Sequence, residues 1–320
     1  MEKEKKVKDV DFAESAVPAS ARKNVVTMFM IMLGFTFFSA SMWVGQQLAD
    51  GLDFWGFLGS LILGGIILGI YTGLLGYVGA KTGLSLDLLS QRAFGEKGSY
   101  LPSAMTSFTQ IGWFGVGSFV SGGTATPNFA RFAKNGKSGA ITTVVAFFIG
   151  NSLMFFFGAV SSIFVGGNDI FEVMVRLNLF YLAVLVLGLN IWTTNDNALY
   201  TAGLGLANIF HQRKKPMVLL SGIIGTVASV WLYYNFCGWL NILNCTLPPV
   251  GMILVLAYFM NKEDFETDQP KLKTIDWFAV AGVILGAIVA NLLHWGIASI
   301  NGMVVAAVCY CVGQAVNKRK

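Results

Sequence analysis

Charged residues are scarce in this chain of 320 residues. Only 12% are Asp, Glu, Lys or Arg, whereas 55% are hydrophobic, and a soluble domain averages about 25% charged residues. This scarcity excludes an ordinary soluble domain and predicts an all-α polytopic membrane protein. The formal net charge is +5, but the basic residues are spread over short loops, so no nucleic-acid partner is expected.

Cysteine and histidine are also scarce. The four cysteines and two histidines form neither a CxxC pair nor a Cys/His cluster, so a disulfide framework and a Cys/His metal site are not expected. No nucleophile–base pair stands out either, which makes an intramembrane enzyme a weak hypothesis. Residues 1–25 are polar and rich in Lys and Glu, which is typical of a solvated cytoplasmic tail and not of a cleavable signal peptide.

The rest of the chain, residues 26–320, is predicted to form a single transmembrane domain. Each of its apolar runs approaches or exceeds the ~20 residues that a helix needs to cross a bilayer. These nine candidate spans are residues 26–50, 55–79, 102–130, 140–165, 177–209, 217–236, 238–260, 277–294 and 297–315. The segment 84–94 is too short and too mixed to cross, and it is predicted to be an amphipathic helix at the interface.

The distribution of Lys and Arg gives an orientation and exposes a contradiction. Basic residues are enriched in cytoplasmic loops, which places the N-terminus in the cytoplasm. The run 102–130 has basic loops at both ends, so it must cross an even number of times. Its length cannot supply two crossings of ~20 residues each. Either this run is re-entrant, or a segment is missing from it.

Residues 187–200 combine an apolar setting with many polar side chains, reading LGLNIWTTNDNALY. Polar side chains at membrane depth are costly and usually line a binding site or an ion path. Contacts between helices are the alternative explanation, but six polar residues within eight positions favour a site. Asp196 is the only acid deep inside a span, and a structural hydrogen bond is a better explanation for it than proton coupling.

Three segments combine apolar residues with residues that weaken helices. They are residues 34–43 (GFTFFSASMW), 118–124 (SFVSGGT) and 248–251 (PPVG). Non-helical backbone at membrane depth is tolerated only where it lines a cavity or is buried in protein. Broken helices near the middle of the bilayer are typical of secondary transporters, so the three segments together favour a carrier.

Several long motifs can be read along the chain: GFTFFSASMWVG, LGIYTGLLGYVGAKTGL, TQIGWFGVG, GNSLMFFFGA, LGLNIWTTNDNALY, GIIGTV and PPVG. They resemble those of the bacterial cytosine permeases in the nucleobase–cation symporter family. The resemblance covers nearly the whole chain after the N-terminal tail. It implies an inverted-repeat sodium-symporter fold of ten core helices plus two, and sodium-coupled uptake of cytosine by alternating access. It also implies a multi-pass protein of the bacterial inner membrane, and we expect a monomer whose partners are a nucleobase and membrane lipid.

The chain departs from that family between Gly117 and Ser118. Its relatives continue from TQIGWFGVG through the rest of the third span, the fourth, the fifth and the start of the sixth. Here the sixth-span motif SFVSGGT follows at once. About nine of the family's twelve spans are therefore present, and the gap falls inside the run that the loop charges singled out. The sequence indicates an internal deletion or an omitted segment.

The resemblance also implies which residues bind the base. Trp113 and Phe119 would stack on it, at ~1–3 kcal/mol for each base–aromatic contact. Gln110 and Asn190 would read its edge, because an amide offers both a donor and an acceptor, and Ser118 would add contacts at the break. On one continuous helix Trp113 and Phe119 would differ by about 120° around the axis and ~9 Å along it. They must therefore belong to separate segments, or this chain does not transport.

The sodium site implied by the resemblance uses oxygen atoms without formal charge. The carbonyls of Gly34 and Phe37 and the hydroxyls of Thr193 and Thr194 would supply them. Asn190 lies one turn before the two threonines, so the base and the ion would share one helix. Two alternatives stay open: a symporter of another nucleobase or a hydantoin, coupled to sodium or protons, and a truncated permease that does not transport.

Overall fold

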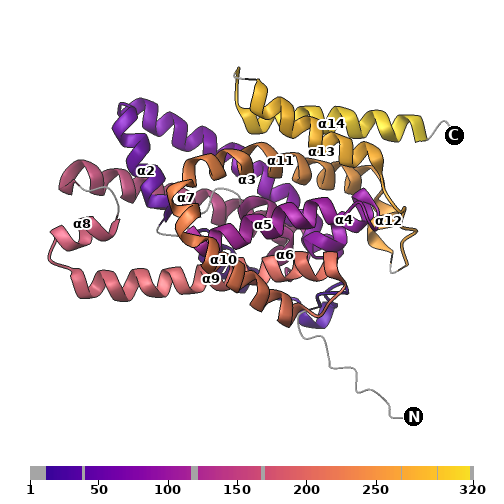
Figure 1. The fold of residues 1–320 in the computed structure, drawn as a ribbon, viewed down its shortest axis with the longest axis horizontal. Coiled ribbons are helices and arrows are strands. Elements are labelled where there is room, and N and C mark those ends of the chain that lie inside the picture. Colours follow the sequence, from indigo (N-terminus) through magenta and orange to yellow (C-terminus); the bar gives the residue numbers. More distant parts are fainter. Residues whose placement is uncertain are drawn as a thin grey trace, which may run out of the picture.

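The computed structural model describes residues 12–37, 40–116, 122–166, 170–267, 269–293 and 295–317, and this part of the chain is helical (Figure 1). In chain order the α-helices are α1 (Val25–Thr36), α2 (Ala40–Gly51), α3 (Phe54–Thr82), α4 (Leu86–Phe94), α5 (Tyr100–Val116), α6 (Thr126–Ala130), α7 (Gly136–Val165), α8 (Ile170–Arg176), α9 (Phe180–Phe210), α10 (Lys214–Tyr234), α11 (Phe236–Met260), α12 (Lys262–Glu266), α13 (Trp277–Leu292) and α14 (Ala298–Asn317). Two short 3-10 helices cover Ala19–Ala21 and Gly122–Ala125. The expectation of an all-α polytopic protein is confirmed.

Several of these helices are long and apolar enough to cross a membrane. Within the described residues they are α3, α7 and α14 over their full lengths, α10 over Lys214–Leu232 and α11 over Gly238–Met260. The helices α1 and α13 are apolar but shorter. Large apolar side chains such as Trp55, Tyr181 and Val227 are exposed on the outside of the bundle, which suits contact with lipid tails.

The predicted interruption in the first span is present. Helix α1 ends at Thr36 and α2 begins at Ala40, and Phe37 at the end of α1 has non-helical backbone angles, with φ −83° and ψ 76°. Gly34 itself is still helical and belongs to the last turn of α1. The second predicted interruption is present in part, because Gly122–Ala125 forms a 3-10 helix before α6. Residues 117–121, which include the junction, lie outside the described residues.

The third predicted interruption is wrong. Pro248 and Pro249 lie inside one continuous helix, α11. A proline removes a backbone donor and crowds the preceding turn, and it can still be accommodated in a spanning helix when neighbouring helices support it. Small residues provide that support here, since a Cβ on Gly286 or Gly302 would lie 3.3 or 3.2 Å from the ring of Pro249. Helices α13 and α14 therefore pack closely on the proline pair and hold α11 together.

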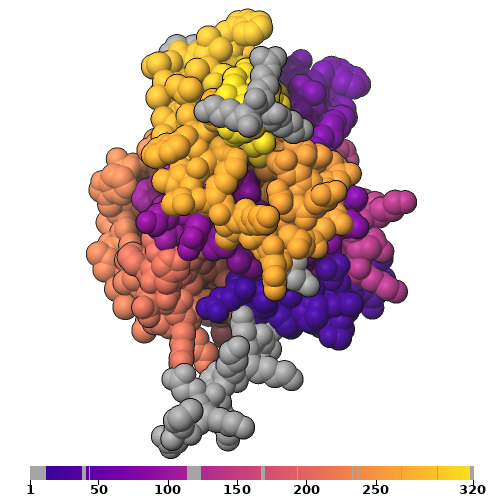
Figure 2. Space-filling model, turned by 90° about the vertical axis from the view of Figure 1, so that its right-hand side faces the viewer, coloured from indigo at the N-terminus to yellow at the C-terminus, as the bar shows by residue number. Residues whose placement is uncertain are grey.

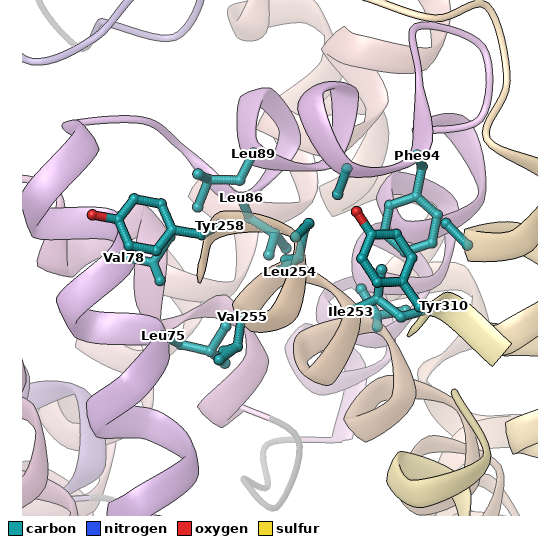
Figure 3. Packing of buried hydrophobic residues seen from close by; sticks show 14 of the residues in the cluster. Leu75, Val78, Leu86, Leu89, Phe94, Ile253, Leu254, Val255, Tyr258 and Tyr310 are labelled. Atoms are coloured by element: carbon teal, nitrogen blue, oxygen red, sulfur yellow. The ribbon is translucent and has the colours of Figure 1, made fainter. Parts of the chain in front are cut away.

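The predicted short helix at residues 84–94 is α4, but its surroundings differ from the expectation of a helix at the lipid interface. Leu86, Leu89 and Phe94 are fully buried. Figure 3 shows them packed against side chains of α11, among them Leu254 and Tyr258. The apolar face of α4 is thus covered by protein. Ser85 caps the helix by accepting a hydrogen bond from the backbone N–H of Leu88 (3.3 Å).

One end of the bundle, which we call the basic end, gathers the loops that carry Lys and Arg. The N–H of Val17 donates to the carbonyl of Gly83 (2.9 Å), and the N–H of Lys23 donates to the carbonyl of Phe132 (2.7 Å). The guanidinium of Arg92 reaches the carbonyl of Asp264 (2.9 Å). Figure 1 shows α4 and α12 at this end and α2 and α8 at the opposite one. Figure 2 looks onto the basic end, where N-terminal and later segments lie side by side.

The run 102–130 begins and ends at this same basic end. The start of α5 follows α4 directly, and the end of α6 returns to α4, where the side chain of Asn128 accepts a hydrogen bond from the backbone N–H of Leu86 (2.7 Å). The structure thus agrees with the conclusion drawn from loop charges that this run leaves one side and comes back to it. The described part of this run, α5 and α6, does not make two full crossings of the bundle.

Candidate functional site

Helices α5 and α9 carry most of the predicted site, and they pack closely against each other. The hydroxyl of Ser107 on α5 donates to the carbonyl of Ala202 on α9 (3.0 Å). A few residues further along α9, Gly205 has no side chain where a Cβ would collide with the Ser107 hydroxyl. The two helices can therefore approach to backbone distance, which places residues on their facing sides in one site.

Trp113 lies inside the protein and not against lipid. Only 2% of it is exposed, and it belongs to a cluster with Ala198 of α9, Trp239 of α11 and apolar residues of α10 and α11. Its ring meets that of Trp239 edge to face, with 4.6 Å between centroids and an interplanar angle of 73°. This contact needs Gly112, because a Cβ at that position would collide with the Trp239 ring.

Gln110 and Trp113 share one face of α5, since they are three residues apart. Gln110 is also 2% exposed. The other predicted partners, Ser118 and Phe119, lie outside the described residues, so the second aromatic face stays a prediction. The aromatic neighbour that the structure does show is Trp239, which no motif singled out. Its indole N–H is buried and has no hydrogen-bond partner among the described residues.

The predicted ion site brings the end of α1 to α9. The amide of Asn190 donates to the carbonyl of Phe37, at the break between α1 and α2 (2.9 Å). Thr194 is 6% exposed, and its hydroxyl donates to the carbonyl of Asn190 (2.9 Å). Gly34 contributes one of the last carbonyls of α1, which have no partner within a regular helix. The side chain of Thr193 lies outside the described residues.

The polar stretch of α9 divides between two faces. Asn190, which was predicted to read the base, uses its amide at the α1 break. Asn195 lies three residues before Ala198, and Ala198 shares a cluster with Trp113. By this spacing Asn195 shares the α9 face that meets α5. It is half-buried, whereas Asp196 is exposed. The sequence placed both asparagines in one polar run, and only the helix contacts separate them.

A cavity of about 360 Å³ lies beside the break between α1 and α2, and it is bounded by α2, α3, α7, α11 and α14. Its lining is mostly apolar, and its polar groups include Ser41, Asn151 and Thr124. The hydroxyls of Tyr71 and Thr124 are hydrogen-bonded there (2.7 Å). The cavity adjoins both interrupted segments, at Ser41 and Thr124, but its lining does not include Gln110 or Trp113.

Three comparisons place this chain among known proteins. It is 37% identical to the cytosine permease of Escherichia coli (strain K12) over 405 residues, which cover 98% of this chain and 96% of that protein. It is 34% identical to the allantoin permease of Bacillus subtilis (strain 168), but only over 82 residues, 26% of this chain and 16% of that protein. Both relatives are permeases and not enzymes.

Solved structures show the same fold. The chain superposes on Mhp1, a nucleobase-cation-symport-1 family transporter, in a closed conformation with bromovinylhydantoin bound, with a TM-score of 0.74 and 15% identity over 94% of each chain. The inward-facing conformation of Mhp1 gives a TM-score of 0.76 at 15% identity, over 95% of this chain and 93% of that one. The expected symporter fold is therefore confirmed.

The same comparisons bear on the junction. The alignment with the E. coli protein spans 405 residues and this chain has 320, so at least 85 aligned positions (405 less 320) have no residue here. The sequence model for permeases for cytosine/purines, uracil, thiamine and allantoin matches in two stretches, residues 16–125 and 116–315. These stretches overlap at residues 116–125, where the sequence indicated a missing segment. Nearly the whole chain is matched, and the protein therefore belongs to this permease family.

Proposed function

We propose that this protein takes up cytosine together with sodium, by alternating access, across a bacterial inner membrane with its N-terminus in the cytoplasm. The identity to E. coli cytosine permease supports cytosine as the substrate. The observation that carries the coupling is the hydrogen bond from Asn190 to the Phe37 carbonyl, because it ties α9 to the break between α1 and α2. The same α9 packs along α5, where Gln110 and Trp113 lie.

The base would bind between α5 and α9. Trp113 is buried, and a flat ring stacked on its face would gain ~1–3 kcal/mol. Gln110 lies one turn away on the same face of α5 and offers a donor and an acceptor to the base edge. Asn195 would complete the edge contacts from α9. In the observed conformation Trp239 packs on Trp113, which is 2% exposed, so side chains around Trp113 would have to move to admit the base.

Sodium would bind at the α1 break. The carbonyls of Gly34 and Phe37 and the hydroxyls of Thr193 and Thr194 are neutral oxygen donors of the hard type that alkali cations prefer. Thr194 donates its own hydrogen to the Asn190 carbonyl, which leaves lone pairs of its oxygen for the cation. A bound ion would fix the spacing between α1 and α9 that the Asn190–Phe37 contact already bridges.

Coupling follows from the shared helix. A cation that pins α9 to the break would also hold Asn195 toward α5, so that the base meets a prepared site. Such coupling requires that each ligand binds one conformation better than the other. Asn190 would then act on the ion side of α9, and not on the base edge as the sequence suggested.

A second candidate is a permease that binds cytosine but does not transport it. It is favoured by the 85 or more positions of the E. coli relative that are missing here. The two candidates differ in uptake and not in binding. A different nucleobase or a hydantoin is a narrower variation, in keeping with the range of substrates in the family's description.

Binding and uptake of radiolabelled cytosine test these proposals in sequence. Purified protein in detergent should bind cytosine more tightly in sodium than in choline chloride, and unlabelled cytosine should compete better than uracil or allantoin. Proteoliposomes should then accumulate cytosine only under an inward sodium gradient. Binding without uptake would establish the non-transporting permease, and absence of cytosine binding in both salts would overturn the proposed substrate.

A further inference from the structure

Four side chains at the basic end, on three helices, are joined by hydrogen bonds in a series, and the backbone of α4 closes this series into a ring. Ser103 of α5 donates to the carboxylate of Asp87 on α4 (2.6 Å). The amide of Asn208 on α9 donates to the Ser103 hydroxyl (2.9 Å), and its oxygen accepts from Gln91 on α4 (2.6 Å). Asp87 and Gln91 are one turn apart on α4. We call these four residues the Asp87 ring.

The Asp87 ring joins the two helices that carry the proposed binding site. Gly205 of α9 lies beside it, where a Cβ would be 2.8 Å from the Ser103 carbonyl and 3.5 Å from an Asp87 oxygen. The close approach of α5 and α9 is therefore set at the level of the ring. A change in the ring should alter the spacing of α5 and α9 further along, at Trp113 and Asn195.

The hydrogen bonds of the ring all point toward the Asp87 carboxylate. Gln91 donates to Asn208, Asn208 donates to Ser103, and Ser103 donates to Asp87. Hydrogen bonds that involve an ionised group are roughly twice as strong as neutral ones. Protonation of Asp87 removes the negative charge that accepts the last hydrogen bond of this series. Keeping that charge buried is costly, however, because the carboxylate loses its hydration. A protonated carboxyl avoids this cost and can still accept the hydrogen bond from Ser103 through its carbonyl oxygen.

We propose that Asp87 is a positioning residue whose protonated carboxyl lets α5 and α9 pack closely, and whose ionisation loosens the two helices and weakens substrate binding. The loosening of the helices is independent of the substrate, and only the binding effect rests on the proposed function. Asp87 is buried, and its burial raises the pKa of the carboxyl to about 6, although the Ser103 hydrogen bond and the charge of Arg131 lower it. The change therefore falls in an accessible pH range.

Other charged and titratable groups face Asp87, and the test must distinguish their effects from that of Asp87. A cavity of about 370 Å³ beside the carboxyl is also lined by Glu14 of the N-terminal segment, His211 after α9 and Lys214 of α10. Arg131, after α6, is fully buried and donates to the hydroxyl of Tyr200 (2.7 Å). His211 is the group whose effect must be distinguished first, and its ring contacts the Tyr100 hydroxyl (2.7 Å).

The test measures the distance between α5 and α9 directly. Spin labels would be attached to cysteines at Phe108 and Phe210, both exposed, in a full-length chain whose four native cysteines are replaced by serine. Distances by double electron–electron resonance would be recorded from pH 5 to pH 8. We expect the distribution to change with a midpoint near pH 6, and the Asp87→Asn variant to keep the acidic distribution at every pH. Equal distributions across the pH range would overturn the proposal.

Two further variants give the test its controls. Ser103→Ala removes the hydrogen bond that favours the carboxylate without removing the acid. It should shift the midpoint of the distance change to higher pH, so that the result does not depend on one variant folding. His211→Gln should keep the wild-type pH dependence. If the dependence disappears in His211→Gln and persists in Asp87→Asn, histidine and not Asp87 is responsible, and the proposal fails.

Cytosine binding supplies the second readout. The wild-type Kd should rise between pH 5 and pH 7.5 by roughly fivefold or more, the lower end of typical coupling between sites, and the rise should be absent in Asp87→Asn. A Kd that rises equally in both proteins would overturn the positioning role. If the wild type binds no cytosine at any pH, the proposed function fails, while the distance measurement still decides the role of Asp87.

Discussion

The basic end and the middle of this bundle are held together by different forces. At the basic end, segments far apart in the sequence are joined by hydrogen bonds between α4, α5, α6, α9 and the N-terminal segment. In the middle, Trp113 rests in an apolar cluster, and the described contact that joins α9 to the α1 break is the bond from Asn190 to Phe37. Directional bonds fix geometry, whereas apolar packing allows side chains to rearrange. This difference suits a rigid frame at the basic end and a binding site in the middle whose side chains can rearrange.

The largest effect is expected at Trp113, in the middle. Trp113→Ala should weaken cytosine binding by roughly 5- to 150-fold, because it removes a stacking partner worth ~1–3 kcal/mol. It also opens a cavity that costs ~3–5 kcal/mol of stability in a packed cluster. The matched control is Trp277→Ala, since Trp277 is 69% exposed on α13. Cytosine affinity and melting temperature would be measured for both. Equal effects of the two substitutions would remove Trp113 from the site.

At the basic end, Asp87→Asn should change how stability depends on pH. The folded-state pKa of about 6 is above the ordinary value of 3.8, so the folded protein holds this proton more tightly than the unfolded chain. The unfolding free energy therefore falls as pH rises between these values, by about 3 kcal/mol at ~1.36 kcal/mol per pKa unit. Melting curves should show this fall in the wild type and a smaller one in Asp87→Asn. A steeper fall in the variant would reverse the assigned sign.

A pair of glycines on α9 sharpens the contrast between frame and site. Gly205→Ala should destabilise the protein by ~1–3 kcal/mol, because the new Cβ collides with Ser107 in a tightly packed contact. Gly188→Ala meets nothing within 4 Å and should be neutral or stabilising by up to ~1 kcal/mol, as expected for alanine in a helix. Denaturation in matched detergent would compare the two. Similar melting temperatures would show that α5 and α9 are not in close contact.

The smallest expected effect separates the two asparagines of α9. Asn190→Ala should reduce the dependence of cytosine binding on sodium, since one hydrogen bond worth ~1 kcal/mol is lost at the break, and the change is about fivefold. Asn195→Ala should weaken cytosine binding equally in sodium and in choline. Binding titrations in both salts distinguish these outcomes. If Asn195→Ala removes the sodium dependence and Asn190→Ala does not, the two assignments must be exchanged.

The sequence predicted the spans, the break after α1 and the return of residues 102–130 to one side, because apolar length and loop charge are local properties. It failed at Pro248 and Pro249, where the outcome depends on glycines of α13 and α14 more than thirty residues away. The Trp113–Trp239 contact depends on the missing side chain of Gly112. Likewise the Asp87 ring combines residues from three helices. Such long-range contacts leave no periodic pattern in a single sequence.

The proposed link between ion and base on α9 is tested most directly by its reciprocity. Sodium affinity would be measured by isothermal titration with and without saturating cytosine, and cytosine affinity with and without saturating sodium. Linkage requires that each ligand changes the affinity of the other by the same factor, and we expect a tightening of at least fivefold in both directions. Sodium and cytosine affinities that do not depend on each other would contradict the account.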